Sequence, residues 1–342
     1  MAFTIIFFNM HLNFNLPKKI LAWYDNNKRD LPWRVSKKSK KNLYYRLLSE
    51  FMLQQTQVKT VLPYFKKFLL NFPTIDSLSE SKEKKILKLW EGLGYYRRAR
   101  NLLASSKIIV RQYKSKLPKE YKDIIKLPGI GDYTANALLA FVYNEPTLAI
   151  DGNVKRVFSR ILNKNESKID FKKIIDINKK KLFKSKRNSD LAEAIMEFGA
   201  LVCKPKEPDC SGCDLKTMCK YFKSKNKYIK TPKTKPKVKS YNIFCYINQK
   251  NQIALTKKHK FGFLNNFYLP PMQEVKSKNL SKNWKYHSNF KNLISNKILD
   301  INLYYKHTSK NPFHSEWFSL KNNYEFIPSF TKRIFKQILK TN

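Results

Sequence analysis

A single glutamate stands inside an otherwise apolar stretch, LSEFML at residues 48–53. Apolar surroundings weaken the hydration of a carboxylate and raise its pKa, which is what a general acid needs near neutral pH. Glu50 is therefore a candidate proton donor. The alternative is a glutamate on the polar face of an amphipathic helix, where it would have no chemical role.

Four of the five cysteines gather in residues 203–219, with six, two and five residues between successive members. They are Cys203, Cys210, Cys213 and Cys219. Thiolate sulfur binds zinc or the iron of an iron–sulfur cluster, and a loop this short has no hydrophobic core of its own. The spacing predicts a metal centre that holds the loop together in a reducing compartment, rather than a disulfide framework. Composition alone leaves zinc and iron–sulfur equally open.

A tight turn is predicted at LPGIG, residues 127–131, before a helical pattern that begins near Tyr133. Gly129 and Gly131 would let backbone N–H groups and a helix N-terminus approach a phosphate. The pattern fits a helix–hairpin–helix, although a Pro-Gly turn by itself is more often an ordinary loop. A second candidate carboxylate, Asp151, follows in the sequence DGNV.

These patterns resemble the MutY type of adenine DNA glycosylases, in the endonuclease III superfamily. The stretch SEFMLQQTQV (49–58) is similar to the family segment that carries the catalytic acid, and the six-two-five cysteine spacing is similar to that of the family's 4Fe–4S ligands. The resemblance extends over residues 22–222 and implies one structural 4Fe–4S cluster on the four cysteines. It also implies that Glu50 and Asp151 are catalytic, with Tyr133 and Asn153 beside them.

The implied reaction is hydrolysis by a monofunctional glycosylase. Glu50 would protonate N7 of adenine and later activate water, and Asp151 would stabilise the positive charge on the sugar. In this superfamily, enzymes with lyase activity carry a lysine at the position of Tyr133. Since a phenol cannot form an imine, Tyr133 favours the use of water.

Further motifs imply which residues would hold the flipped base and the duplex. RDLPWR (29–34) and MEFGA (196–200) resemble family segments that line the adenine pocket, although core packing is the alternative for the tryptophan. The implied pocket residues are Arg29, Leu31, Trp33, Arg34, Val58 and Glu197. WEGLGYY (90–96) resembles a loop whose first tyrosine wedges into the base stack. The implied DNA contacts are Gln54, Gln55, Tyr95, Gly129 and Gly131.

The end of the chain resembles the MutT-like domain with which this family inspects the base opposite adenine. Residues 262–270 are similar to its G-L-x-G-G-x-W-x-x-P segment, with asparagine at both inner glycines. The family's Phe-Ser-His recognition loop aligns with residues 294–296, which makes Ser295 and Asn296 the expected opposite-base contacts. His287-Ser288 is a weaker alternative.

Positioning these residues requires a mainly α fold, two-lobed, followed by a small α+β domain. Apolar residues keep helical spacing from Leu47 through Phe65. Similar helical patterns recur over residues 84–91, 99–113, 133–143, 153–162 and 190–201, and strands that pair are predicted over 241–247 and 253–256. We expect four parts: an unmatched extension (1–15), a helical glycosylase domain (16–222), a Lys/Pro linker (223–239) and an α+β domain (240–342).

Composition supports a nucleic-acid partner. Lys and Arg number 69 against 25 Asp and Glu, a formal charge of +44 that a polyanion would screen, although drift toward A/T-rich codons would also enrich lysine. With 42% hydrophobic and 14% aromatic residues, a fully disordered chain is excluded. The apolar first eight residues lack the basic flank and cleavage site of a secretory signal, and no apolar run reaches the ~20 residues of a membrane span.

The sequence thus predicts a monomeric enzyme, cytoplasmic and nucleoid-associated, with no membrane partner. Its partner would be double-stranded DNA that contains adenine opposite 8-oxoguanine or guanine. One alternative is an endonuclease III-like pyrimidine glycosylase/AP lyase, against which Tyr133 argues. The other is a noncatalytic basic DNA-binding protein of the same fold, against which the intact Glu50, Asp151 and four cysteines argue.

Overall fold

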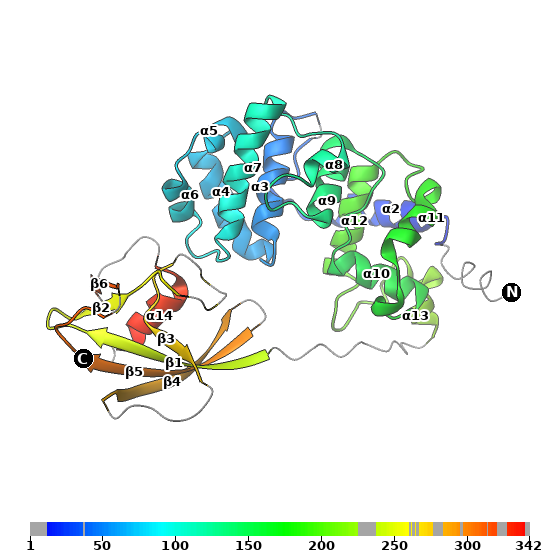
Figure 1. Cartoon of the computed structure of the whole chain (residues 1–342). Helices are drawn as coiled ribbons and strands as arrows, with labels where there is room; N and C mark the ends of the chain where they lie inside the picture. The colour runs from blue at the N-terminus through cyan, green and yellow to red at the C-terminus, as the bar shows by residue number, and fades with distance from the viewer. Residues whose placement is uncertain are drawn as a thin grey trace. The chain divides into compact units, whose positions relative to one another are not determined.

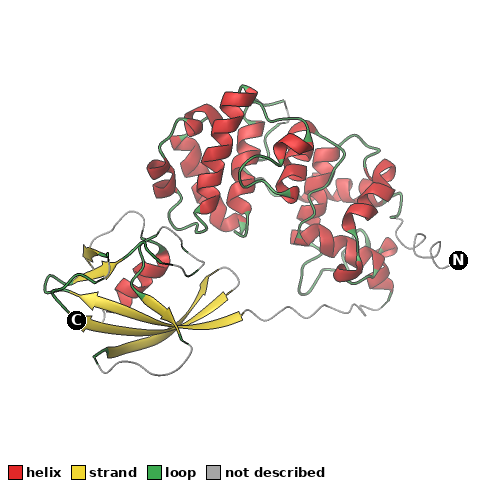
Figure 2. Cartoon of the chain, in the orientation of Figure 1, coloured by secondary structure: helices red, strands yellow, loops and turns green. Residues whose placement is uncertain are grey.

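The computed structural model describes residues 12–36, 38–224, 237–259, 261, 264, 267–275, 283–294, 297–312, 314–319 and 327–338. The chain divides into two compact units, residues 1–89 with 95–232 and residues 90–94 with 233–342. In the described residues, the strands all follow residue 236 and one helix accompanies them, whereas the first unit is helical (Figure 2). The expected mainly α fold with a small α+β part is therefore confirmed.

The first unit consists of short and medium helices (Figure 1). Their bounds are α2 (Leu16–Asn27), α3 (Asn42–Leu53), α4 (Val58–Asn71), α5 (Ile75–Ser79), α6 (Glu83–Leu89), α7 (Arg97–Tyr113), α8 (Tyr121–Ile124), α9 (Asp132–Tyr143), α10 (Gly152–Leu162), α11 (Phe171–Leu182), α12 (Asn188–Leu201) and α13 (Lys220–Lys223), with 3-10 turns η1 (Glu166–Lys168) and η2 (Lys216–Met218).

Two packed groups of helices form this unit. Buried apolar side chains of α2, α9, α10, α11 and α12 make one continuous core. Helices α3, α4, α5, α6 and α7 pack on one another and bury large side chains such as Phe51, Phe65 and Phe68. The chain enters the first core earlier than expected, because Leu12, assigned to the unmatched extension, is buried and its N–H donates to Asn178 Oδ1 at 2.9 Å.

The helical pattern from Leu47 through Phe65 is two helices rather than one. Helix α3 ends at Leu53 and α4 begins at Val58, with Gln55 between them at φ 58°. A non-glycine residue in this left-handed region cannot continue a helix, so the backbone turns there. The hydrophobic spacing remains in phase across the break, which is why it did not show in the sequence.

The second unit is a six-stranded sheet with one helix (Figure 1). Its elements are β1 (Lys237–Ile247), β2 (Gln252–Leu255), β3 (Met272–Glu274), β4 (Lys285–Ile294), β5 (Lys297–His307), β6 (Glu316–Ser319) and α14 (Ser329–Ile338). The strand order is β4-β5-β1-β2-β6, and β3 pairs with β1. Strands β1 and β5 run parallel, and the other pairs are antiparallel. Helix α14 contributes Phe330, Ile334 and Phe335 to the core of this unit.

The predicted linker is shorter than expected at both ends. Lys223 is the last residue of α13, and Lys237–Lys239 already belong to β1, where they pair with residues 297–299 of β5. The pairing of 241–247 with 253–256 is confirmed through Ile247 and Ile253. Part of the linker, and residues 262–263 and 265–266 of the MutT-like segment, lie outside the described residues. Among the described residues, no helix is long and apolar enough to cross a membrane.

Candidate active site

Three helices of the first unit bring the predicted catalytic side chains into one neighbourhood. Glu50 lies in α3 and is 7% exposed, so the polar-face alternative is wrong. Burial raises the pKa of Glu50 to about 7; the charge of Arg46 opposes this rise, and the charge of Asp151 adds to it. An interaction with the Tyr133 hydroxyl lowers the pKa slightly. The pKa is thus shifted in the direction that the apolar sequence around Glu50 predicts.

Tyr133 is the second residue of α9, directly after the hairpin turn. Burial, and then the charges of Glu50 and Asp151, raise the pKa of Tyr133 well above its ordinary value. The phenol is therefore neutral at physiological pH and acts as a hydrogen-bond donor toward Glu50.

Asp151 caps the N-terminus of α10. Its Oδ1 accepts a 2.7 Å hydrogen bond from the Val154 N–H, and its Oδ2 accepts a 2.7 Å bond from Asn153 Nδ2. Burial raises the pKa of Asp151, but these hydrogen bonds stabilise the anion and oppose the rise. The helix N-terminus adds positive potential at the same place. The two carboxyl groups thus lie in different settings: Glu50 is buried within a helix, and Asp151 accepts hydrogen bonds at the start of one.

Asn153 is held from its other side by residues that sequence reasoning did not assign to the site. Its Oδ1 accepts a 2.7 Å hydrogen bond from Arg156 Nη2, which also donates to the Gly199 carbonyl at 2.6 Å. Arg156 Nε donates to the Cys203 carbonyl at 2.7 Å. The backbone of the first cysteine is thereby connected to Asp151 through two side chains. The sequence offered one indication of their role: Arg156 lies just after DGNV (151–154), and Gly199 lies within MEFGA (196–200).

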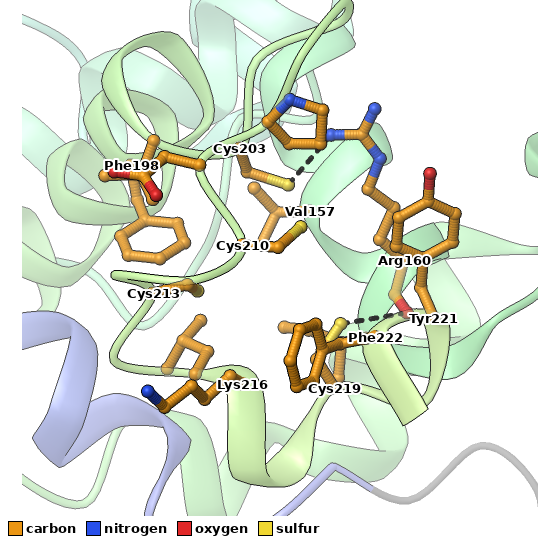
Figure 3. A pocket seen from close by; sticks show the side chains of 15 residues that line it. Val157, Arg160, Phe198, Cys203, Cys210, Cys213, Lys216, Cys219, Tyr221 and Phe222 are labelled. Atoms are coloured by element: carbon orange, nitrogen blue, oxygen red, sulfur yellow. Dashed lines mark hydrogen bonds between the residues drawn. The ribbon is translucent and has the colours of Figure 1, made fainter. Parts of the chain in front are cut away.

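The four cysteines line one cavity, together with Val157, Phe198 and Tyr221 (Figure 3). Arg160 Nη1 donates to Cys203 Sγ at 3.3 Å and to the Lys204 carbonyl at 2.7 Å. Burial raises the pKa of the Cys213 thiol to about 11. Four sulfur donors around one hollow fit a soft metal centre, and the arginine beside them suits the negative charge that thiolate ligands carry. In the part of the chain that the structure describes, no three metal-binding side chains already converge on one ion position.

The charged residues of the expected adenine pocket form ion pairs between α12 and the segment before α3. Burial raises the pKa of Glu197, but hydrogen bonds from Arg29 and Arg34 outweigh it and lower the pKa to about 2. Arg29 binds both carboxylate oxygens, at 2.7 and 2.8 Å, and Arg34 Nη2 lies 2.9 Å from Oε2. Arg29 and Arg34 also line a cavity of about 370 Å³.

The apolar residues of the expected adenine pocket pack in or beside the protein core. Leu31 and Trp33 are buried, and Trp33 packs edge-on against Phe65 with ring centroids 5.2 Å apart, as its core-packing alternative expects. Val58 is the first residue of α4 and is half-buried.

A second acid, Glu193, is missing from the sequence-based assignment although it is central to this ionic group. Its carboxylate accepts from Arg34 Nε at 2.6 Å, Arg46 Nη2 at 2.5 Å and the Tyr24 hydroxyl at 2.6 Å. Arg46 and Glu193 are each 5% exposed. Glu193 lies one helical turn before Glu197 on α12, which is the signal that could have found it.

The expected DNA contacts gather where α3 ends. Gln54 Nε2 donates to the Gly129 carbonyl at 3.3 Å, and Gln55 is exposed with φ 58°. Gly129 has φ +80°, and a Cβ there would lie 2.7 Å from Asn101 Cβ, so this turn requires glycine. Gly131 is the N-cap of α9.

Tyr95 is 42% exposed and also adopts a left-handed backbone, with φ 48°. The buried Arg98 lies 5.5 Å from the Tyr95 ring centroid. Arg98 Nη1 also donates to the carbonyls of Phe51, Met52 and Gln54, which are among the last acceptors of α3. Arg98 therefore joins the Gln54–Gln55 turn to Tyr95, a role that no motif predicted.

The expected opposite-base contacts, Ser295 and Asn296, lie outside the described residues, between the end of β4 at Ile294 and the start of β5 at Lys297. The alternative, His287-Ser288, lies inside β4 at an irregularity of its pairing with β5, and His287 Nδ1 is 2.8 Å from Ser288 Oγ.

Comparisons with known proteins agree with this geometry. Residues 48–182 match the family model of the HhH-GPD superfamily base excision DNA repair proteins. The chain is 35% identical to the adenine DNA glycosylase of Buchnera aphidicola subsp. Schizaphis graminum. This alignment of 344 positions covers 93% of this chain and 96% of the relative. The chain is 40% identical to the adenine DNA glycosylase of Buchnera aphidicola subsp. Baizongia pistaciae, over 74% of this chain and 72% of the relative.

A solved structure shows the same fold. A thermostable thymine-DNA glycosylase matches with a TM-score of 0.53 at 23% identity, over 61% of this chain and 95% of that one. The first of these relatives aligns with 93% of the chain, and the family model spans both Glu50 and Asp151. The chain therefore belongs to the MutY-type adenine DNA glycosylases of the helix–hairpin–helix superfamily, which act in base excision repair.

Proposed function

We propose that this enzyme hydrolyses the N-glycosidic bond of adenine mispaired with 8-oxoguanine or guanine in double-stranded DNA, and that it has no lyase activity. The observation that carries the proposal is Glu50, a buried acid with a pKa of about 7, opposite the donor-bound Asp151. This arrangement suits a reaction that needs one protonated and one ionised carboxyl group.

In the proposed mechanism, Glu50 protonates adenine at N7 as the glycosidic bond breaks and then activates water. Asp151 faces the sugar, whose developing positive charge its anion stabilises. Tyr133 is neutral and donates a hydrogen bond toward Glu50. Its hydroxyl cannot attack the sugar to form an imine, so water completes the reaction.

The adenine must leave the base stack before Glu50 can reach it. The exposed Gln55 and Tyr95, both on left-handed backbone, are placed to fill the space in the duplex. Arg29, Arg34 and Glu197 would contact the flipped base through their polar edges. The glycine turn at 129–131 and the N-terminus of α9 would bind a phosphate.

We further propose one 4Fe–4S cluster on Cys203, Cys210, Cys213 and Cys219, with a structural role. The support is a single cavity lined by all four sulfurs, with Arg160 beside Cys203 to offset the negative charge of a thiolate-bound cluster. Zinc is the alternative metal, and iron content with brown visible absorption distinguishes the two.

The preference between the two opposite bases depends on Ser295 and Asn296. Since the family's histidine is replaced by Asn296, we expect 8-oxoguanine to be favoured over guanine less strongly than the Phe-Ser-His loop would favour it. A monomeric state and a location at the nucleoid remain predictions from the sequence.

The test is strand cleavage, after alkali, of duplexes that place adenine opposite 8-oxoguanine, guanine, cytosine or thymine. Cleavage is expected for the first two, and Glu50→Gln is expected to abolish it while duplex binding persists. Glu80→Gln removes an exposed carboxylate and serves as the matched control. Unchanged turnover of Glu50→Gln would overturn the assignment, and efficient borohydride trapping of enzyme on DNA would instead indicate a lyase.

A further inference from the structure

A chain of alternating charges, buried except at Arg29, connects the helix of the proposed acid to the expected adenine pocket. Arg46 is bound to Glu193, Glu193 to Arg34, Arg34 to Glu197, and Glu197 to Arg29, at distances of 2.5, 2.6, 2.9 and 2.7 Å. Three cations and two anions therefore form one linear array. Arg46 is its terminal cation on the side of α3.

Arg46 precedes Glu50 by one turn of α3, so both side chains leave the same face of the helix. The guanidinium is fixed from several directions. It lies 5.0 Å from the ring centroid of Phe141 in α9, and its Nε is 3.4 Å from Asn42 Oδ1. Glu193 of α12 completes this environment, and the arginine is 5% exposed.

A charge that is buried in this way acts strongly on its neighbours, because little water screens it. Arg46 and Glu193 form a pair, so their effects on Glu50 oppose one another. Replacing Arg46 removes the cation beside the acid and leaves Glu193 bound by Arg34, whereas replacing Glu193 removes the anion and leaves Arg46 without its carboxylate partner. Replacing both removes the pair without creating an excess of either sign.

We propose that Arg46 is a positioning residue of the glycosylase, and that its ion pair with Glu193 sets the pH range in which Glu50 donates its proton. This inference rests on the proposed function of Glu50 as the general acid. Arg46 itself touches neither base nor sugar in the proposed mechanism; it acts through Glu50.

The groups that face Glu50 come from four elements. They are Arg46 from α3, Tyr133 from α9, Asp151 at the start of α10 and Glu193 from α12. Tyr133 is neutral, so the charged neighbours are one cation and two anions. Arg46 lowers the pKa of Glu50, and Asp151 and Glu193 raise it, which fixes the sign of each substitution.

The experiment is a pH profile of adenine release under single-turnover conditions. Since only protonated Glu50 can donate, the rate falls as the pH rises through its pKa. Arg46→Gln is expected to move this alkaline limb to higher pH, and Glu193→Gln to lower pH, each by roughly half to one pH unit. In the double variant, the alkaline limb is expected to lie close to that of the wild type. Arg46→Lys keeps the positive charge, so its alkaline limb is expected at the wild-type pH.

A purely structural role for the pair predicts lower rates in both single variants with the limb unmoved, and that result would overturn the inference. Breaking a buried pair costs about 3–5 kcal/mol of stability, so both single variants are expected to be less stable than the wild type. Glu193→Gln keeps the shape and an acceptor oxygen for Arg46, and it decides the question alone: a limb that does not move to lower pH contradicts the proposal. Failure of the proposed function is distinct, since the wild type would then release no adenine or Glu50→Gln would remain active.

Discussion

Gly199 of α12 lies so close to Asn153 of α10 that a Cβ at position 199 would fall 2.6 Å from Asn153 Cβ and 3.1 Å from its carbonyl oxygen. Cβ atoms essentially never lie within 3.0 Å of another heavy atom, and the Cβ of Asn153 is fixed to its backbone, so one helix would have to move. Asn153 is also the donor to Asp151 Oδ2, and the displacement would reach the proposed active site.

Gly199→Ala is therefore expected to slow adenine release about tenfold or more, because misplacing a catalytic group by less than 1 Å is enough for such a loss. The free energy of unfolding is expected to fall by about 1–3 kcal/mol. Single-turnover kinetics and urea denaturation measure the two effects. Gly152→Ala is the control for stability, because its Cβ meets nothing within 4 Å. Equal stability of the two variants would show that the close contact has no consequence.

Glu50 links activity to stability with a definite sign. Its pKa is about 7 in the folded protein and about 4.3 in an unfolded chain, so the folded state loses stability as the pH rises through this interval. Glu50→Gln, which does not ionise, is expected to raise the free energy of unfolding by roughly 3–4 kcal/mol at pH 8 and by only about 1 kcal/mol at pH 5. Urea denaturation at both values is the measurement, and an equal change at both would contradict the ionisation argument.

Arg98→Lys is expected to impair base flipping although it keeps the charge. An ammonium group cannot reproduce the guanidinium's contacts with three carbonyls at the end of α3 while lying over the Tyr95 ring. We expect at least a tenfold loss of adenine release and a weaker signal from a fluorescent adenine analogue at the target position. Arg97→Lys changes the exposed neighbouring arginine and is the matched control. Similar losses in both variants would instead assign the effect to guanidinium contacts with DNA.

The four cysteines that line the cavity are expected to be needed for iron binding, whereas the fifth cysteine, Cys245, is not. Cys213→Ser removes a sulfur from the cavity, and we expect it to lose iron and brown visible absorption. Cys245→Ser makes the same chemical change at a buried cysteine in β1 of the second unit, and we expect it to retain both. Iron analysis of the two purified variants is the measurement. Retention of full iron by Cys213→Ser would remove this residue from the ligand set.

Short contiguous motifs account for what could be predicted from the sequence. Glu50 and the four cysteines each lie in a few residues whose types and spacing carry the chemistry. Arg46 and Glu193 could not be found this way, because they come from helices far apart in the chain and meet only through tertiary packing. Arg98 could not be found either, because it binds carbonyl groups of another helix. Every residue has a backbone carbonyl, so such a contact cannot be recognised from residue types.

Local composition also misplaced one boundary. Lys237–Lys239 belong to a lysine-rich stretch that is typical of a linker, and lysine is depleted in strands. They are nevertheless part of β1, because β5 offers a complete ladder of partners from Lys297 onward. Strand formation there is decided by a distant segment, which a local pattern cannot reveal.

The parallel pairing of β1 with β5 has a consequence for the order of folding. Every β1 residue from Lys237 to Ile247 finds its partner between Lys297 and His307, so the central ladder of the sheet closes only after most of the second unit has been synthesised. Helices form from near neighbours and fold quickly, whereas such distant pairings fold slowly. The helical unit is therefore expected to fold first on the ribosome. A chain interrupted before Lys297 would leave β1 with an open edge, the kind of surface from which aggregation begins.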